Sequence, residues 1–170
     1  MYPTIQTKRL SLRPLEAADA EVLFKSYQVK GVLQYFPPST TPTLDRVQHY
    51  IERQQEHWEN YGYGHWGIVP KGEKQIIGWA GLQFLPELNE TEVGYFLDKS
   101  QWNKGFATEA ANASIQFGFD ECGLDHIIAL VHPENIASKR VIDKCQFVYV
   151  ETIHLWGIDL MRHTRANTTK

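Results

Sequence analysis

The segment that most constrains the fold is an alternating stretch that runs into a polar turn and then into an alanine-rich stretch. Residues 92–98 (EVGYFLD) alternate like a β-strand, with Val93, Tyr95 and Leu97 on one face and the residues between them on the other. Residues 108–114 (TEAANAS) have the alanine content of an α-helix. A strand, a turn and a helix in this order predict an α/β unit with free backbone amides where the helix begins.

The start of that helix is a favourable place for a phosphate group. The helix dipole contributes about half a positive charge there, and a glycine in the turn lets phosphate approach the backbone closely. Four small residues share one helix face, which predicts close packing of the helix on a sheet: Ala107, Ala111, Ser114 and Gly118. Two interpretations of the stretch stay open, a phosphate-binding turn and an ordinary loop before a well-packed helix.

Residues 102–107 (WNKGFA) resemble the acyl-CoA pyrophosphate loop of the GNAT N-acetyltransferase superfamily, whose pattern is Gln/Arg-x-x-Gly-x-Gly/Ala. Gly105 and Ala107 occupy the two small positions. Trp102 stands where Gln or Arg is commonest, and Asn103 stands where a further glycine is frequent. The Trp variant, followed by Ala-Thr-Glu-Ala, is similar to the branch that includes the ribosomal-protein N-terminal (alanine) acetyltransferases.

Two further matches, at residues 131–147 and 7–14, extend the resemblance over nearly the whole chain. The resemblance implies a single N-acetyltransferase domain over residues 1–170. Its fold class is α/β (α+β): a mixed six- to seven-stranded sheet with a central splay and helices on both faces. The sequence pattern predicts strands at residues 7–15, 65–69, 75–85, 92–98, 126–132, 147–153 and 158–162. It predicts helices around residues 22–27, over 41–60 with Thr41 as the N-cap, from residue 108, and over 136–144.

The resemblance also implies acetyl-CoA as the cosubstrate. Its pantetheine arm carries two amides, which an exposed length of strand backbone can bind in the splay. The residues expected to bind the cofactor are Phe96, Leu97, Trp102, Asn103, Lys104, Gly105, Phe106, Ala107, Thr108, Asn135 and Ser138.

Acetyl transfer to an amine needs a neutral amine and a proton donor for the leaving thiolate. A lysine-type amine, with a pKa near 10.4, costs about 4.6 kcal/mol to neutralise at pH 7, whereas an α-amine near 7.8 costs about 1 kcal/mol. Glu92, at the start of the central strand, is the candidate base. A solvated carboxylate at the edge of the strand is the alternative interpretation. Glu109 is expected to favour the helix dipole and not to act in catalysis.

Asn135 and Ser138 form the second candidate pair. Asn135 follows a proline and can cap the helix from residue 136, and the resemblance implies a contact with the pantetheine arm as well. Ser138 is the candidate acid, because its hydroxyl could hydrogen-bond the sulfur. Many GNAT enzymes place a tyrosine acid seven residues after that asparagine, where this chain has Ile142, and Tyr149 is a remote alternative.

Composition narrows the classes of partner. A net charge of −3 argues against a dedicated nucleic-acid binder, and no apolar run reaches the length of a membrane span. The two cysteines lie outside any CxxC motif, which favours a reduced, cytoplasmic setting, and Cys145 is expected in the core. No metal site is expected. The acceptor would be a peptide N-terminus or a small-molecule amine, and the protein a monomer or a homodimer.

Two functions therefore compete. The first is an acetyl-CoA-dependent N-acetyltransferase in which a primary amine attacks the thioester directly. The alternative is a catalytically silent acyl-CoA-binding regulatory or partner-binding module, which Ile142 and Trp102 motivate. The segment between residues 147 and 161 is shorter than the final hairpin of many members of the branch, so a ribosomal-protein substrate is not expected.

Overall fold

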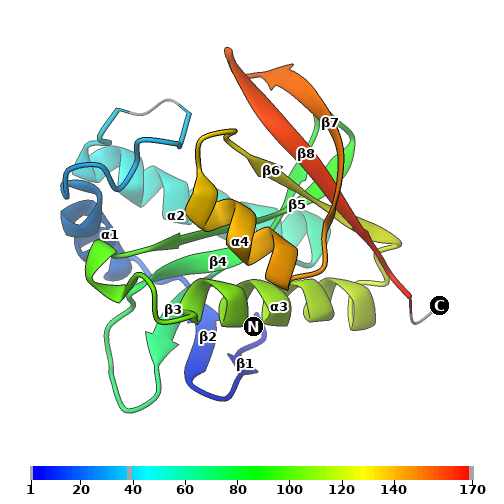
Figure 1. The fold of residues 1–170 in the computed structure, drawn as a ribbon. Helices are drawn as coiled ribbons and strands as arrows, with labels where there is room; N and C mark the ends of the chain where they lie inside the picture. The colour runs from blue at the N-terminus through cyan, green and yellow to red at the C-terminus, as the bar shows by residue number, and fades with distance from the viewer. Residues whose placement is uncertain (1, 38–39, 169–170) are drawn as a thin grey trace.

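One mixed sheet of eight strands organises the computed structural model of the protein, which describes residues 2–37 and 40–168 (Figure 1). The ends and residues 38–39 of the expected domain, 1–170, fall outside the described ranges. The strand order is β1-β2-β3-β4-β5-β6-β8-β7, and every neighbouring pair is antiparallel except β5 and β6. The strands are β1 (Ile5–Gln6), β2 (Leu10–Pro14), β3 (His65–Pro70), β4 (Gly78–Leu85), β5 (Glu90–Leu97), β6 (His126–Val131), β7 (Val148–Leu155) and β8 (Ile158–Ala166).

The expected mixed α/β class is confirmed, but the count of six to seven strands was one too low. The additional strand is β1, which pairs with β2 at only two positions, Ile5 with Leu12 and Gln6 with Ser11. A strand of two residues contains no periodicity that a sequence pattern could reveal.

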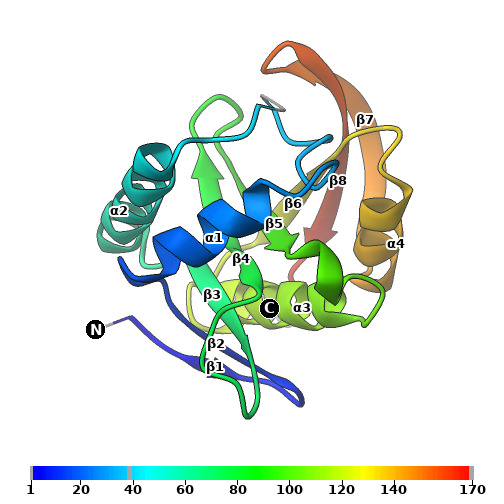
Figure 2. The ribbon, with the colours of Figure 1, turned by 90° about the vertical axis from the view of Figure 1, so that its left-hand side faces the viewer.

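Four α-helices cover both faces of the sheet, α1 and α2 on one face and α3 and α4 on the other (Figures 1 and 2). They are α1 (Asp19–Tyr27), α2 (Leu44–Tyr61), α3 (Phe106–Asp120) and α4 (Ile136–Lys144), with a short 3-10 helix η1 (Lys99–Gln101). The prediction that Thr41 caps α2 was wrong. Thr43 is the cap, and its hydroxyl accepts a hydrogen bond from the Arg46 amide at 3.3 Å. The chain after Pro42 therefore becomes helical two residues later than expected.

The central strand β5 separates two apolar layers. Val93 and Leu97 are buried in the layer beneath α3 and α4, and Tyr95 packs against it. Phe96 is buried in the other layer, beneath α1 and α2. The predicted alternation of faces is therefore confirmed. The small face of α3 also lies close on the sheet, because a Cβ at Gly118 would stand 2.6 Å from Leu82 Cδ1.

The sheet splits between β5 and β6. These parallel strands are in register at a single pair, Glu92 with Ile128, whereas β4 and β5 pair at eight positions. Beyond that pair the two strands diverge toward their carboxyl ends, as Figure 1 shows. The expected central splay is therefore present, and it leaves part of the β5 backbone without a paired strand on the side that faces β6.

Charged side chains join the strands at the base of the split. Arg162 of β8 donates through Nε to Glu90 of β5 at 2.9 Å, and His126 Nε2 lies 3.0 Å from the same carboxylate. Burial alone would raise the pKa of Glu90, but hydrogen bonds from Arg162 and His126 outweigh it and hold the pKa below the ordinary value. None of the helices in the described ranges combines the length and apolarity needed to cross a bilayer.

Candidate active site

The turn before α3 presents a run of free backbone amides. Among residues 2–37 and 40–168, no acceptor is found for the amide groups of residues 103–108, and the first helix-type bond in this region runs from the Glu109 amide to the Gly105 carbonyl. Asn103 and Gly105 have left-handed backbones, with φ of 62° and 78°. Residues 102–105 are exposed. Such amides at a helix N-terminus are the donors that an anion such as a diphosphate needs.

Arg9 fixes the shape of this turn from outside. Its guanidinium donates to the Lys104 carbonyl at 2.7 Å and to Glu109 Oε2 at 2.7 Å. It also lies over the Phe106 ring, 4.6 Å from the centroid. Glu109 further accepts hydrogen bonds from the Arg9 amide and the Thr7 hydroxyl, so this carboxylate ties the first turn of α3 to the β1–β2 turn. Glu109 therefore has a structural role as the link between these two segments.

Trp102, which replaces the usual Gln or Arg, anchors the turn to β5. Its indole Nε1–H donates to the Leu97 carbonyl at 3.0 Å, and 40% of the residue remains exposed. Lys99 Nζ lies 5.8 Å from the indole ring centroid. The indole thus holds the free amides of the turn beside the end of β5, where the strand borders the split.

Glu92 stands where β5 and β6 part. Its side chain is partly exposed, and the Leu130 backbone amide of β6 donates to it across the split. Burial raises the pKa of Glu92 to about 8, and the hydrogen bond from Leu130 opposes that shift. A carboxylate whose pKa lies near the working pH is suited to take a proton from an amine. Of the two interpretations of Glu92, this environment favours the base over a solvated edge carboxylate.

Ser138 has a partner that the sequence did not indicate. Its Oγ lies 2.7 Å from the Tyr95 hydroxyl, which brings the first turn of α4 against β5. Burial raises the pKa of Tyr95, while the hydrogen bond with Ser138 opposes the shift, so the phenol stays protonated. Alternation placed Tyr95 on the correct face of β5, but no local signal connects it with a residue 43 positions later.

Asn135 caps α4, as expected. Its Oδ1 accepts a hydrogen bond from the Ser138 amide at 3.0 Å, which orients the first turn of the helix and with it the Ser138 hydroxyl. Ile142 is buried in the core at 1% exposure. Tyr149 lies on β7, two strands away from β6, and pairs with Thr152 at 3.1 Å.

The candidate acid and base lie on opposite faces of β5. Tyr95 faces α3 and α4 with Val93 and Leu97, and alternation places Glu92 on the face of Phe96, toward α1 and α2. A thioester bound in the split would therefore have a base on one side and a hydroxyl pair on the other.

The side chains of Phe96, Lys104 and Cys145 are not positioned to take part directly in the reaction. The Phe96 side chain is buried at 3%, so only its backbone can meet a cofactor, and Lys104 Nζ donates to Gln101 Oε1 at 3.0 Å. Cys145 is fully buried, and burial raises the pKa of its thiol to about 11, in agreement with a structural role. The described part of the chain contains no cluster of three or more His, Cys, Asp or Glu side chains fit for a metal ion.

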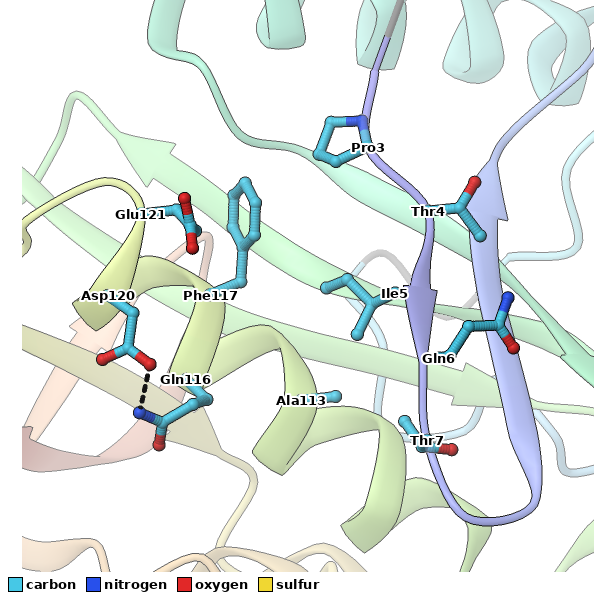
Figure 3. Close-up of a pocket in the computed structure, with 10 residues that line it drawn as sticks. All are labelled: Pro3, Thr4, Ile5, Gln6, Thr7, Ala113, Gln116, Phe117, Asp120 and Glu121. Carbon is cyan, nitrogen blue, oxygen red and sulfur yellow. Dashed lines mark hydrogen bonds between the residues drawn. The ribbon is translucent and has the colours of Figure 1, made fainter.

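A cavity of about 560 Å³ lies elsewhere, between the N-terminal segment and the outer side of α3 (Figure 3). Its lining includes Ile5 and Phe117, with Gln116 hydrogen-bonded to Asp120 at 2.6 Å at one end. None of the residues expected to bind a cofactor or to act in catalysis lines it.

Comparison with known proteins places this arrangement in a family. The sequence model described as "Acetyltransferase (GNAT) domain" matches residues 9–148. The Bacillus subtilis (strain 168) protein named "Uncharacterized N-acetyltransferase YoaA" is 29% identical over 148 residues, which cover 86% of this chain and 84% of that protein.

Two solved structures show the same fold at lower identity. A putative GnaT-family acetyltransferase from Bordetella pertussis has a TM-score of 0.84 at 21% identity, over 96% of this chain and 99% of that one. RimL, a ribosomal L7/L12 alpha-N-protein acetyltransferase in complex with coenzyme A, has a TM-score of 0.83 at 16% identity, over 99% of this chain and 100% of that one.

Proposed function

Because the chain belongs to the GNAT acetyltransferase family, we propose that it transfers the acetyl group of acetyl-CoA directly to a primary amine, with Glu92 as base and Ser138, supported by Tyr95, as acid. The observation that carries this proposal is that one end of the split between β5 and β6 has free amides, at residues 103–108, and the split also contains Glu92, a carboxyl group with a raised pKa. The acceptor is a peptide N-terminus or a small-molecule amine.

The residues of the turn would hold the cofactor at its diphosphate. The amides of Asn103, Lys104, Gly105, Phe106, Ala107 and Thr108 would donate to the phosphate oxygens, and the Trp102 anchor would keep them beside β5. The backbone of Phe96 and Leu97, together with Asn135, would border the pantetheine arm in the split. The acetyl-CoA itself supplies the activated acyl group.

In the reaction, Glu92 accepts a proton from the ammonium form of the amine, directly or through water, and the neutral nitrogen forms a bond to the acetyl carbon. The nitrogen then loses its second proton to water as the carbonyl re-forms and the carbon–sulfur bond breaks. The Ser138 hydroxyl donates a hydrogen bond or a proton to the departing sulfur, and the Tyr95 hydroxyl, 2.7 Å from Ser138 Oγ, can pass on a proton from water to restore it. Ser138 and Tyr95 together supply the proton donor that Ile142, at the position of the usual tyrosine acid, cannot supply. Their presence favours a working enzyme over a silent coenzyme-binding module.

A thermal-shift experiment with coenzyme A tests the cofactor site. At a hundredfold excess over Kd, a bound ligand adds about 2.7 kcal/mol to the free energy of unfolding. We expect coenzyme A and 3′-phospho-ADP to raise Tm, since both carry phosphates for the turn, and pantetheine alone to raise it less. No shift with coenzyme A would refute the proposal.

Turnover is tested by release of free thiol from acetyl-CoA in the presence of peptides, amino-acid amides, polyamines and aminoglycosides. We expect thiol release with at least one acceptor, and mass spectrometry should show one added acetyl group on its amine. A Tm shift without turnover on any acceptor would instead support the silent binding module.

A further inference from the structure

His65, at the start of β3, is a buried side chain that the reaction above does not use. It is 4% exposed and stacks on Trp79, with ring centroids 4.3 Å apart and planes 11° apart. Its Nδ1 lies 2.7 Å from the Tyr50 hydroxyl. Its Nε2 has no hydrogen-bond partner among residues 2–37 and 40–168, although every fully enclosed side-chain nitrogen or oxygen there has one. Nε2 is therefore not fully enclosed.

The Tyr50 contact favours one of the two neutral tautomers of His65. Burial, with a smaller effect of His57, lowers the pKa of His65 to about 3, so the ring is neutral. Within the described residues, the Tyr50 hydroxyl has His65 Nδ1 as its one hydrogen-bond partner. If Tyr50 donates to Nδ1, the hydroxyl and Nδ1 are both satisfied, and the His65 proton is on Nε2, where it has no partner among the described residues. The other tautomer would leave the Tyr50 proton without an acceptor.

Glycines at two neighbouring positions bring His65 close to the central strand. His65 pairs with Gly81 of β4, and Gly81 pairs with Gly94 of β5, so the three residues form one row across the sheet. A Cβ at Gly94 would stand 3.8 Å from His65 Nε2 and 3.2 Å from Cζ3 of Trp79, the ring that stacks on His65. Gly94 is partly exposed and lies on the same face as Glu92, roughly 7 Å along the strand.

We infer that His65 Nε2–H is a hydrogen-bond donor for the acceptor substrate, and that it selects amines with a carbonyl oxygen on the carbon next to the amine-bearing carbon. With the amine at Glu92, such an oxygen is three bonds from the nitrogen and can extend toward Gly94 and His65. The inference rests on the proposed function, because it assumes that the amine reacts at Glu92. His65 is a specificity residue and not a second base, since its accessible nitrogen already carries a proton.

The basicity of the amine agrees with this assignment. A carbonyl group near an amine lowers the amine pKa toward the α-amine value of about 7.8, close to the pKa of about 8 of Glu92. Proton transfer between the two is then nearly balanced. A simple alkylamine must first lose a proton against a difference of more than about two pKa units.

Two acceptors of the same skeleton test the inference. L-Alaninamide and isopropylamine differ in that a carboxamide replaces one methyl group. We expect His65→Phe to lower kcat/KM for L-alaninamide about ten- to a hundredfold, the usual effect of removing one hydrogen bond from a buried site, and to change it less than about threefold for isopropylamine. Gly94→Ala keeps the imidazole but puts a methyl group 3.8 Å from Nε2, with the Trp79 ring yielding by a few tenths of an ångström, and should give the same selective loss. The control His163→Phe changes another buried histidine, on β8, and should affect both acceptors equally.

A binding measurement separates this inference from the proposed function. In protein with ¹⁵N-labelled histidine, the His65 resonances should show a proton on Nε2 from pH 5 to 8. With coenzyme A bound, L-alaninamide should shift them and isopropylamine should not. A proton on Nδ1, equal shifts with both amines, or equal losses of kcat/KM in His65→Phe would overturn the role of His65 even if the enzyme acetylates amines. If Glu92→Gln abolishes turnover for every acceptor and His65→Phe does not, the proposed function stands and only the role of His65 is rejected.

Discussion

Glu92 is the one residue of β5 that is in register with β6, and this position determines the acidity of its carboxyl group. Its folded pKa of about 8 is above the ordinary value of 4.5 because burial disfavours the charged form. Below pH 4.5 the folded and unfolded states are both protonated there. Between pH 4.5 and 8 the unfolded state ionises first, so this residue lowers the free energy of unfolding as pH rises, and the loss is complete above pH 8.

We therefore predict opposite effects of Glu92→Gln on activity and on stability. The turnover number should fall by about 10²- to 10⁴-fold, the usual contribution of a positioned base. Tm should rise at pH 8, by about 2–4 °C for each kcal/mol recovered, and stay unchanged at pH 4.5. Rate measurements and calorimetry at the two pH values check both parts. Unchanged turnover would remove Glu92 from the reaction, and a lower Tm at pH 8 would contradict its burial as a neutral group.

Ser138 and Tyr95 act as a pair because one hydrogen bond links them. We predict that Ser138→Ala lowers kcat about tenfold or more, because the leaving thiolate loses its donor, and that the Kd for coenzyme A changes less than about twofold. Tyr95→Phe should lower kcat in the same sense, and the double variant should lose less than the two single losses combined. Steady-state kinetics and calorimetric titration separate the two quantities. Ser11→Ala, on β2, is the control, and normal kcat in Ser138→Ala would exclude this residue.

At the level of elements, the turn between β5 and α3 owes its shape to three contacts that involve its neighbouring segments. Arg9 holds the Lys104 carbonyl, Glu109 holds Arg9, and Trp102 holds the Leu97 carbonyl. These contacts use the Lys104 carbonyl and the Trp102 indole and none of the backbone amides of the turn, so the amides stay free. The left-handed backbone at Gly105 is part of the same shape.

Gly105→Ala tests that shape against a matched control. Gly157, in the β7–β8 turn, has nearly the same φ, 79° against 78°, but a Cβ there would have no neighbouring atom within 4 Å, whereas a Cβ at Gly105 would meet Arg9 Nη2 at 3.2 Å. Both alanine variants should lose about 1–2 kcal/mol of stability from left-handed strain. We predict that Gly105→Ala alone weakens coenzyme A binding, by about tenfold in Kd. Equal Kd values in the two variants would argue against a phosphate site in this turn.

For the whole molecule, the split of the sheet is both the site and a structural weakness. A single registered pair joins β5 to β6, so the two halves of the sheet depend on helix packing and on the Glu90–Arg162 ion pair. Both side chains are mostly buried, with 15% and 18% of their surface exposed. This explains why the sheet can open along β5 and still fold as one unit.

We predict that Arg162→Met lowers the free energy of unfolding at pH 7 by about 1–3 kcal/mol, since it leaves the Glu90 charge without its main partner. The pKa of Glu90 is depressed in the folded state, so the contribution is present above the ordinary value of 4.5 and is lost as pH falls through the folded pKa. Denaturant unfolding at pH 7 and pH 3 should show the difference shrinking at the lower pH. Glu151→Gln, which removes the exposed partner of Arg162, is the control and should change stability by less than about 0.5 kcal/mol. A deficit of equal size at both pH values would contradict the assigned ion pair.

The sequence by itself determined the local elements and the loop. The alternation of residues 92–98, the alanine-rich helix and the capping asparagine are local patterns, and each element was found, although β5 and α3 begin two residues earlier than predicted, at Glu90 and Phe106. Patterns of this kind follow from the periodicity of the backbone, which a chain expresses over a few neighbouring residues.

Only the tertiary structure decided which side chains meet. It paired Tyr95 with Ser138, brought Arg9 to Glu109 and directed His65 Nε2 toward Gly94, over separations of 29 to 100 positions in the chain. It also added β1 and set the acidity of Glu92, which depends on burial in the split and not on its neighbours in sequence. Long-range contacts and desolvation arise only when distant segments pack together, so no local pattern encodes them.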